Sequence, residues 1–446
     1  MVILVILFAA SVTSVGCGDD SAPVDSGTAD SGATDSGADL DSGTDLDSGA
    51  DDSAVAMDSG STDGDTPDSA ADAATDGAAD ASLPNSTVVS KLLPSDGAAS
   101  DFFGWSIAID GDTVIVGSHF HDGQAGAAYV FVRSGDTWTE EARLQPADSA
   151  AQDYFGNSVA LHGDTAIIGA PGDDTGGASA GSAYVFVRSG TTWSQQSKLS
   201  ASDPRTLNRF GFAVAISGDT ALVGAFANDN NGAAYTFERT GTSWSAASKL
   251  VHDGPTNGRF GIAVALDGDT AIVGASAARR AYIYSRGATS WDQVTTLQSA
   301  TAASREGNSV DIEGDTAIVG SPAETNTNGS RAGAAYVYVR SGATWPEEQQ
   351  LLGDEATGGD NFGSAVALAG ERAVVGAVGN DTVADNAGAA YLLERTGTTW
   401  TTTTTLTASD GTASAFYGFS ASFSGNFMAI GASGADAAYI VPLGSL

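Results

Sequence analysis

Cysteine, histidine and positive charge are all scarce in this sequence. Its one cysteine, Cys17, cannot form a disulfide within the chain. It has four histidines, and 18 lysines and arginines against 55 aspartates and glutamates, for a formal net charge of −37 at pH 7. Such a field repels nucleic acid and anionic membrane surfaces, so neither is an expected partner. The charge suits a soluble secreted protein, cation-rich surroundings or a basic partner.

Helical periodicity is absent too, and no segment has a credible helix cap. Short runs rich in Val, Ile, Ala, Tyr and Phe alternate with turns that contain glycine, which is typical of β-strands. The apolar stretch at the N-terminus, residues 1–16, is too short to span a bilayer as a helix. The sequence therefore predicts an all-β protein.

Residues 1–16 have the features of a secretory signal peptide, an apolar run followed by small residues. Small residues immediately before a lone cysteine resemble the bacterial lipoprotein signal, in which that cysteine carries the lipid. Ser14 stands where that signal usually has Leu or Val, and no Lys or Arg precedes the apolar run. We expect lipid attachment at Cys17, on an outer-membrane or cell-surface lipoprotein of a bacterium that contacts the membrane only through this anchor. An ordinary signal peptide, giving a secreted or periplasmic protein, is the alternative.

Residues 17–85 consist mainly of Asp, Ser, Gly, Ala and Thr. They carry 18 aspartates and no Lys, Arg or Glu. Such a segment cannot bury enough apolar surface to offset its chain entropy, and its like charges extend it. We predict a disordered acidic linker that lifts the rest of the chain off a membrane.

Residues 86–446 repeat one pattern seven times. Two glycines lie 13 residues apart in every copy: Gly104/Gly117, Gly156/Gly169, Gly211/Gly224, Gly261/Gly274, Gly307/Gly320, Gly363/Gly376 and Gly418/Gly431. A tyrosine and a tryptophan lie 9 apart in six copies: Tyr129/Trp138, Tyr184/Trp193, Tyr235/Trp244, Tyr282/Trp291, Tyr336/Trp345 and Tyr391/Trp400. About 50 residues per copy is the size of one propeller blade of four strands.

Each copy divides into four strands, A to D. In the second copy we expect them at 157–161, 165–169, 183–188 and 193–199. A tight turn containing glycine joins A to B, since glycine supplies the positive φ of a short hairpin. Small residues on the inner strands and Trp and Tyr on the outer strands fit blades that converge on an axis. The fold class is therefore a seven-bladed β-propeller.

The two ends of the repeat region complement each other. The seventh copy stops at its strand C and lacks strand D. Before the first copy, Leu92 lies 12 residues ahead of Gly104, as Leu144 does ahead of Gly156. We predict that residues 87–92 supply the missing strand of the last blade, which closes the ring and removes its free edges.

Phe-Gly at strand A and Gly-Ala-Pro after strand B resemble the FG-GAP repeat. FG is intact at Phe103, Phe155, Phe210, Phe260 and Phe362, and it is replaced by Glu306-Gly307 and Tyr417-Gly418 in the fifth and seventh copies. The full GAP occurs at Gly169-Ala170-Pro171. The resemblance covers the whole repeat region. It implies the seven-bladed propeller found at the N-terminus of integrin alpha subunits and in many bacterial surface proteins.

Integrin-type repeats hold calcium in a longer A–B loop, D-x-D-x-D-G-x-x-D. Here that loop is reduced to one carboxylate per turn, at Asp112, Asp164, Asp219, Asp269, Asp315 and Glu371. One carboxylate cannot supply the six to eight oxygens that calcium takes, so a turn-stabilising role is the better interpretation. We expect no metal and no cofactor at these turns, although oxygen-rich loops elsewhere leave weak calcium binding possible.

Variation in length is concentrated in the B–C connections, which span 8 to 16 residues from the GAP glycine to the tyrosine. In an up-and-down blade these loops and the D–A loops emerge on one face, where variable loops on a rigid scaffold commonly bind partners. Relaxed selection on exposed loops would give the same variation. The candidate binding residues are polar: His119, His121, Asp122, Asp173, Asp174, Asn228, Asp229, Asn230, Asn326, Asn328, Asn380, Asp381 and Asp385. His119 and His121 could also form a pair of metal ligands, or simply be exposed.

No nucleophile–base set is evident, and no catalytic residue is assigned. The C–D turns resemble the Asp-box hairpin of sialidase propellers, with Arg in place of Asp, but that box is structural. We therefore expect a monomeric, non-catalytic module for binding or adhesion at the cell surface, with an extracellular protein or glycan as partner. The alternative is an extracellular propeller glycoside hydrolase or lyase, whose two carboxylates a sequence alone would not reveal.

Overall fold

The computed structural model describes residues 89–300 and 305–446. The predicted signal peptide, Cys17, the acidic linker and residues 87–88 of the predicted closing strand lie outside these residues. In the described part, no helix has the length and hydropathy needed to cross a bilayer.

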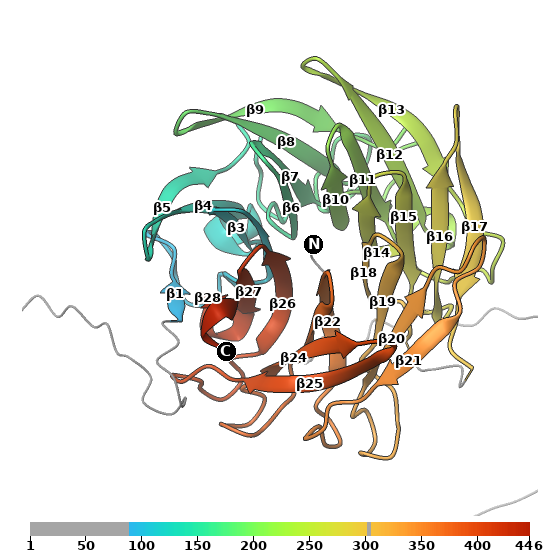
Figure 1. The fold of residues 1–446 in the computed structure, drawn as a ribbon. Coiled ribbons are helices and arrows are strands. Elements are labelled where there is room, and N and C mark those ends of the chain that lie inside the picture. The colour runs from blue at the N-terminus through green and yellow to red at the C-terminus, as the bar shows by residue number, and fades with distance from the viewer. Residues whose placement is uncertain (1–88, 301–304) are drawn as a thin grey trace, which may run out of the picture. The chain divides into compact units, whose positions relative to one another are not determined.

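The described chain forms seven antiparallel sheets of four strands arranged in a ring (Figure 1). We number them as blades 1 to 7. Blade 1 contains β2 (Ser106–Asp110), β3 (Thr113–Ser118), β4 (Ala127–Ser134) and β5 (Thr137–Leu144), and blade 2 contains β6 (Ser158–His162), β7 (Thr165–Ala170), β8 (Ser182–Ser189) and β9 (Thr192–Leu199). Blade 3 contains β10 (Ala213–Ser217), β11 (Thr220–Ala225), β12 (Ala233–Thr240) and β13 (Ser243–Leu250), and blade 4 contains β14 (Phe260–Asp267), β15 (Thr270–Ala275), β16 (Arg280–Arg286) and β17 (Trp291–Leu297).

The remaining blades follow the same order. Blade 5 contains β18 (Ser309–Glu313), β19 (Thr316–Ser321), β20 (Ala334–Val339) and β21 (Glu347–Leu351), and blade 6 contains β22 (Phe362–Ala369), β23 (Arg372–Ala377), β24 (Ala389–Thr396) and β25 (Thr399–Leu406). Blade 7 contains β26 (Tyr417–Ser424), β27 (Phe427–Ala432), β28 (Ala437–Pro442) and β1 (Ser90–Leu92). Four short helical turns lie between or after strands: α1 (His121–Gln124), η1 (Asn228–Asn230), η2 (Ser433–Ala435) and η3 (Leu443–Ser445). The predicted fold class is confirmed.

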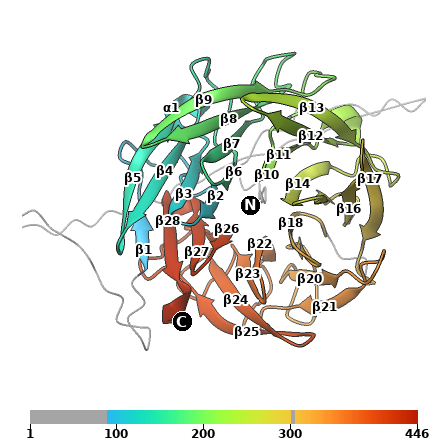
Figure 2. The ribbon, with the colours of Figure 1, turned by 45° about the horizontal axis from the view of Figure 1, so that its top comes forward.

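Strand A of each blade lies nearest the axis and strand D at the rim (Figure 2). Each A strand packs against the A strands of both neighbours, including β2 against β26, so the ring is closed. The B strands are almost wholly buried, whereas a D strand such as β9 buries fully only its last residue, Leu199. The apolar core therefore lies between the blades, and polar residues cover the outside.

The glycines at the invariant spacing form the tightest contact between blades. A Cβ atom added to Gly117 would lie 2.0 Å from the carbonyl oxygen of Gly156 in the next blade, and one added to Gly169 would lie 1.8 Å from that of Gly211. The same contact recurs around the ring and ends with Gly431 against Gly104. No side chain fits there, so both glycines of the motif are required for close packing of backbones.

Ring closure through the N-terminal strand is also confirmed. β1 pairs antiparallel with β28, with Ser90, Lys91 and Leu92 opposite Ile440, Tyr439 and Ala438. Lys91 forms an ion pair with Asp410, which also accepts a hydrogen bond from the Tyr439 hydroxyl at 2.7 Å. The three residues of β1, which precede the first blade, thus complete the last blade.

Leu92 and Leu93 provide a direct test of this closure. Leu92 is 3% exposed and packs with Phe103 and Ile440, whereas Leu93 is 55% exposed. We expect Leu92→Ala to lower the free energy of unfolding by about 2–5 kcal/mol, because it leaves a cavity between blades 7 and 1. Leu93→Ala should change it by less than about 0.5 kcal/mol. Urea unfolding followed by tryptophan fluorescence would measure both, and equal effects would contradict the described closure.

Candidate functional site

The propeller has two unlike faces. The B–C loop of each of several blades ends beside the start of strand A in the next blade, through parallel bridges such as Gly126 to Phe155 and Gly388 to Tyr417. The B–C and D–A loops therefore share one face, here called the loop face, as the sequence predicts. The A–B and C–D turns form the opposite turn face.

A repeated clamp between blades occupies the turn face. In blade 2, Arg188 Nε donates to Asp164 at 2.7 Å, its Nη1 donates to Thr113 of blade 1 at 3.1 Å, and its guanidinium lies over the Trp193 ring. Trp193 Nε1 donates to Glu141 of blade 1 at 3.0 Å. The recurring Arg, Trp and turn Asp therefore join neighbouring blades, and the turn carboxylates are occupied by arginines.

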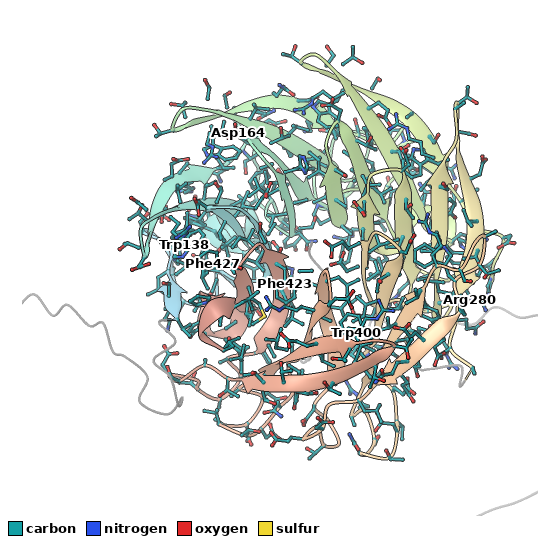
Figure 3. All side chains as sticks on the ribbon, in the orientation of Figure 1. Trp138, Asp164, Arg280, Trp400, Phe423 and Phe427 are labelled. Carbon is teal, nitrogen blue, oxygen red and sulfur yellow. The ribbon has the colours of Figure 1, made fainter. Side chains whose placement is uncertain are left out.

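The same clamp closes the ring between blades 1 and 7. Trp138 packs edge-on against Phe427, with ring centroids 5.9 Å apart, and the two lie side by side in Figure 3. The Arg133 guanidinium lies 4.7 Å from the centroid of the same Phe427 ring. These contacts explain the invariant distance from Tyr to Trp as a packing requirement.

On the loop face, the aspartate eight residues before the FG glycine has a role that its spacing did not reveal. Asp203 accepts hydrogen bonds from the Tyr235 hydroxyl and from Lys249 Nζ, each at 2.6 Å. Asp96 likewise accepts from Tyr129 and Arg143. The partners come from strands C and D of the blade that the loop enters, so this aspartate fixes the D–A loop to its blade.

Five of the predicted binding residues are buried and used by the loops themselves: His119, His121, Asp173, Asn228 and Asn380. Asp173 accepts from Tyr184, Ser182 and Lys198. Asn228 donates to the Tyr235 hydroxyl and accepts from Lys249. Buried groups with these partners hold the loop in one conformation, and they can meet a ligand only if the loop rearranges.

The remaining predicted residues lie nearer the surface. Asp122, Asp174, Asp229, Asp381 and Asp385 are exposed, and Asn326 and Asn328 are half-buried. Asp122 pairs with Arg143 and Asp229 with Arg205, while Asn328 donates to the Gly353 carbonyl. The side chain of Asn230 lies outside the described structure. The structure thus does not gather the thirteen residues into one site, because they are distributed over the loops of five blades.

The two histidines near α1, His119 and His121, lie in different surroundings. His119 lies in an aromatic cluster, 4.1 Å from the Trp105 ring and 4.4 Å from the Phe120 ring between centroids. Burial lowers the pKa of His119 to about 3, so it is neutral at physiological pH. His121 is held by Asp101, 2.8 Å from its Nδ1. Neither is exposed, and among the described residues no group of three or more His, Cys, Asp or Glu is arranged to hold a metal.

Sequence reasoning missed the residue that precedes FG in each copy. All seven have a left-handed backbone with φ between 56° and 62°: Phe102, Tyr154, Arg209, Arg259, Arg305, Asn361 and Phe416. We call these the rim positions. They lie in the D–A loops of the loop face, and Asn361 is the one that is buried. Their only sequence signal is alignment of the copies on FG, which shows aromatic residues in blades 7, 1 and 2 and arginines in blades 3 to 5.

A hollow of about 450 Å³ opens on the loop face between blades 4 and 5. Arg279, Arg305 and Arg331 line it, together with Ser276. No carboxylate of the described residues pairs with any of these three arginines. The hollow combines positive charge with residues from two B–C loops and one D–A loop.

The family model for the FG-GAP repeat matches seven segments of the chain: residues 87–131, 138–186, 193–237, 244–288, 291–338, 345–393 and 400–441. Each segment begins at a strand D and ends in the following strand C, and the first includes the closing strand. No curated protein matches the sequence.

Solved structures share the architecture at low sequence identity. A candidate 6-phosphogluconolactonase from Bacteroides uniformis is 11% identical, with a TM-score of 0.50 over 68% of this chain and 85% of its own. A chain of the mitotic checkpoint complex is also 11% identical, with a TM-score of 0.51 over 79% of this chain and 93% of its own. At this identity the likeness shows the fold alone.

Glu306, which replaces the Phe of FG in blade 5, predicts a pH dependence. Burial raises its pKa to about 7, against hydrogen bonds from Tyr338 and the Ser299 amide that favour the charged form. The unfolded chain releases this proton near pH 4.5, so the stability is complete below that pH and falls as the pH rises through about 7. Relative to the wild type, Glu306→Gln should gain on the order of 3 kcal/mol between about pH 5 and 8.

Thermal and urea unfolding across this range would measure the gain. Asp136→Asn, an exposed change in the C–D turn of blade 1 and far in sequence from Glu306, is the control and should follow the wild type at every pH. Parallel pH profiles for the wild type and Glu306→Gln would show that this carboxyl does not titrate in the folded protein as described.

Asp173 predicts the opposite dependence. Burial opposes its charge, but hydrogen bonds from Lys198, Thr175 and Tyr184 outweigh burial and lower its pKa to about 2. Its stabilisation is therefore complete above about pH 4 and lost as the pH falls through about 2. We expect Asp173→Asn to cost about 3 kcal/mol at neutral pH, where Lys198 loses a buried partner.

The adjacent Asp174 is exposed and serves as the control, since Asp174→Asn should cost less than about 1 kcal/mol. Calorimetric unfolding at neutral and acidic pH compares the two variants. If Asp173→Asn were as stable as Asp174→Asn at neutral pH, the buried network would not contribute as described.

Proposed function

Because this chain belongs to the FG-GAP repeat family, and its loop face alone varies between copies, we propose that it is a non-catalytic binding module. The turn face is standardised: every A–B turn is closed by one glycine with φ near 55°, and the recurring clamp occupies its side chains. A surface that repeats seven times around a ring offers the same contacts at every blade. It therefore cannot discriminate one partner from another.

The loop face has the properties that recognition needs. Its B–C loops differ in length from 8 to 16 residues, yet each is ordered by its own buried polar groups and by hydrogen bonds to the next blade, such as Phe155 N to Ala125 O at 3.0 Å. Ordered loops lose little entropy on binding, which favours affinity. The B–C loops differ from blade to blade and are nevertheless ordered, and this observation carries the proposal.

The partner is an extracellular glycan or protein, presented to a module that is anchored through Cys17 and the acidic linker. The apolar leader before Cys17 supports export and display. The module works as a rigid platform, since its strands are paired through all seven blades.

Loop grafting tests this function. In the full chain carrying Cys17→Ser, the B–C loop of blade 6, residues 378–388, is replaced by the short loop of blade 4, residues 276–279. The control exchanges C–D turns between blades 2 and 3, residues 189–191 and 240–242. On a glycan array and a panel of extracellular matrix proteins, the loop graft should change the binding profile and the turn exchange should not.

Turnover decides between binding and catalysis. Glycans that bind are incubated with the protein, and new reducing ends and unsaturated products are measured. We expect intact glycan. Hydrolysis or elimination that is lost with the loop graft would establish the glycoside hydrolase or lyase reading instead, and a binding profile that follows the turn exchange would overturn the assignment of the face.

A further inference from the structure

We propose that the loop face binds an acidic polysaccharide, with its carboxylates on the arginines of blades 3 to 5 and its sugar rings on the aromatic residues of blades 7, 1 and 2. This inference rests on the proposed function and assigns its ligand class. Three independent features carry it: the identity of the residues at the rim positions, the pairing of the basic residues, and the aromatic cluster.

The backbone conformation at the rim positions is unfavourable for the side chains that occupy them. A left-handed backbone costs a residue with a side chain about 1–2 kcal/mol, and glycine and asparagine adopt it most readily. Yet six of the seven rim residues are Phe, Tyr or Arg, and asparagine occurs only at Asn361. Backbone geometry therefore does not explain the choice of side chain. The left-handed backbone itself belongs to the D–A loop of the repeat, because Ser100, Gln152, Leu207, Asn257 and Ser414, two residues before a rim position, share it. The choice of side chain at the rim positions, and not the backbone strain, is therefore what points to a ligand.

The basic residues divide into two groups. Twelve of the 18 form ion pairs with described carboxylates. The other six form none with described residues: Arg209, Arg259, Arg279, Arg280, Arg305 and Arg331. Five of them lie in the D–A or B–C connections of blades 3 to 5. The sixth, Arg280, is the first residue of β16, directly after the B–C loop of blade 4, and is labelled at that side of the ring in Figure 3.

This division is informative because the chain has about three times as many acidic as basic residues. Partners are abundant, and the clamps on the turn face use them. Arginines without a carboxylate partner, three of them around a hollow of about 450 Å³, form a local positive site on a negative protein. A hollow of this size is within the range of about 300–1,000 Å³ for ligand sites. The guanidinium group binds carboxylates through paired hydrogen bonds.

The aromatic half of the rim is continuous. Phe102 packs edge-on against Phe120 with centroids 5.0 Å apart, Phe120 lies 5.8 Å from Tyr154, and Trp105 lies 4.5 Å from Phe419. Phe102, Trp105, Phe120 and Tyr154 remain half-buried, with ring surface open to solvent. Exposed aromatic faces pack well against the C–H groups of sugar rings. A ligand that carries only charged groups has no apolar surface to place on them and fits this half of the face poorly.

Two polar atoms inside this cluster have no partner in the described structure, although both are buried: Trp105 Nε1 and His119 Nδ1. An unsatisfied buried polar atom costs about 1–3 kcal/mol. A neutral His119 can accept or donate at Nδ1, and Trp105 can donate. Both atoms are buried as they stand, so a sugar hydroxyl supplies the missing partner through a bridging water or after the loop rearranges.

An acidic polysaccharide and a nucleic acid differ in where they carry their charge. The net charge of −37 repels both, so binding of either depends on the local positive charge of the loop face, but a nucleic acid carries its charge on phosphates between the sugars. An acidic polysaccharide places a carboxylate on a sugar ring, so one residue can meet an arginine while its neighbour meets an aromatic ring. Tyr154 and Arg209 occupy the rim positions of adjacent blades, where the two halves join.

Calorimetric titration with matched probes tests the assignment. The full chain carrying Cys17→Ser is titrated with a polygalacturonate oligosaccharide, with the same oligosaccharide as its methyl ester, and with single-stranded DNA. We expect binding of the acid form, at least tenfold weaker binding of the ester, and no DNA binding. Salt should weaken the acid form and leave the ester unchanged.

Asparagine substitutions separate the contributions without loss of the fold, because Asn361 already occupies a rim position. Arg259→Asn and Arg305→Asn should each weaken binding of the acid form about tenfold and leave the ester unchanged. Tyr154→Asn should weaken both forms. Arg372→Asn, with the same change of charge on the turn face, is the control and should leave the affinity unchanged. Melting temperatures verify that each variant is folded.

Three results would overturn the proposal: no binding of the acid form, equal affinity for acid and ester, or equal loss from Arg372→Asn and Arg305→Asn. If the loop graft still alters binding to another glycan or protein in that case, the loop face remains the binding surface and only its ligand class is wrong. If the turn exchange alters binding instead, both the ligand class and the face are wrong.

Discussion

The propeller depends on one contact between backbones, repeated seven times. The glycine that ends strand B of each blade lies against the carbonyl oxygen of the FG glycine in the next blade, so close that no Cβ fits. Because each copy contains both glycines, every blade makes this contact with the blade before it and with the blade after it, and the spacing of 13 positions between the two glycines cannot vary. The last contact, between Gly431 and Gly104, makes the ring close without a gap. The Arg–Trp clamp of the turn face also joins neighbouring blades. It lies farther from the axis, where the blades diverge and larger side chains fill the space.

The architecture was accessible from sequence because this contact fixes distances along the chain. Invariant spacings defined the blades, glycine located the A–B turns, and Leu92 located the closing strand in the correct register. The loops were less accessible. Asp203 and its equivalents resemble turn caps in sequence, but they bind a tyrosine and a lysine that lie 32 and 46 residues away. Polar residues such as Asp173 and Asn228 looked available for binding, whereas the fold uses them inside the loops. No periodicity marks burial in an irregular segment, so burial there is decided by tertiary contacts.

The net charge of the chain hides a difference between the two faces in how their charged residues are paired. On the turn face, carboxylates of the A–B turns neutralise the clamp arginines. On the loop face, Asp96, Asp203 and Asp410 neutralise the basic residue near the end of strand D in blades 1, 3 and 7. Blades 4 to 6 have Thr296, Gln350 and Thr405 at that position. The arginines of blades 4 and 5 therefore do not substitute for a missing member of this network. They lie at the rim positions and around the hollow, where the repeated ion pairs of the fold do not use a basic residue.

Departures from the repeat also collect beside the hollow. Blade 5 replaces the Phe of FG with Glu306, directly after Arg305, and its B–C connection is the longest of the seven, while that of blade 4 is among the shortest. The buried carboxyl of Glu306 needs Tyr338 and the Ser299 amide as partners, which an aromatic ring would not. This position is Phe in five of the seven copies, and a buried acid there lowers the stability of blade 5. The arginines without a carboxylate partner and the buried acid beside one of them, Arg305, occur on the same side of the ring. Both are most simply explained if that side is shaped by a ligand, because packing alone would favour the Phe that five other copies have at the position of Glu306.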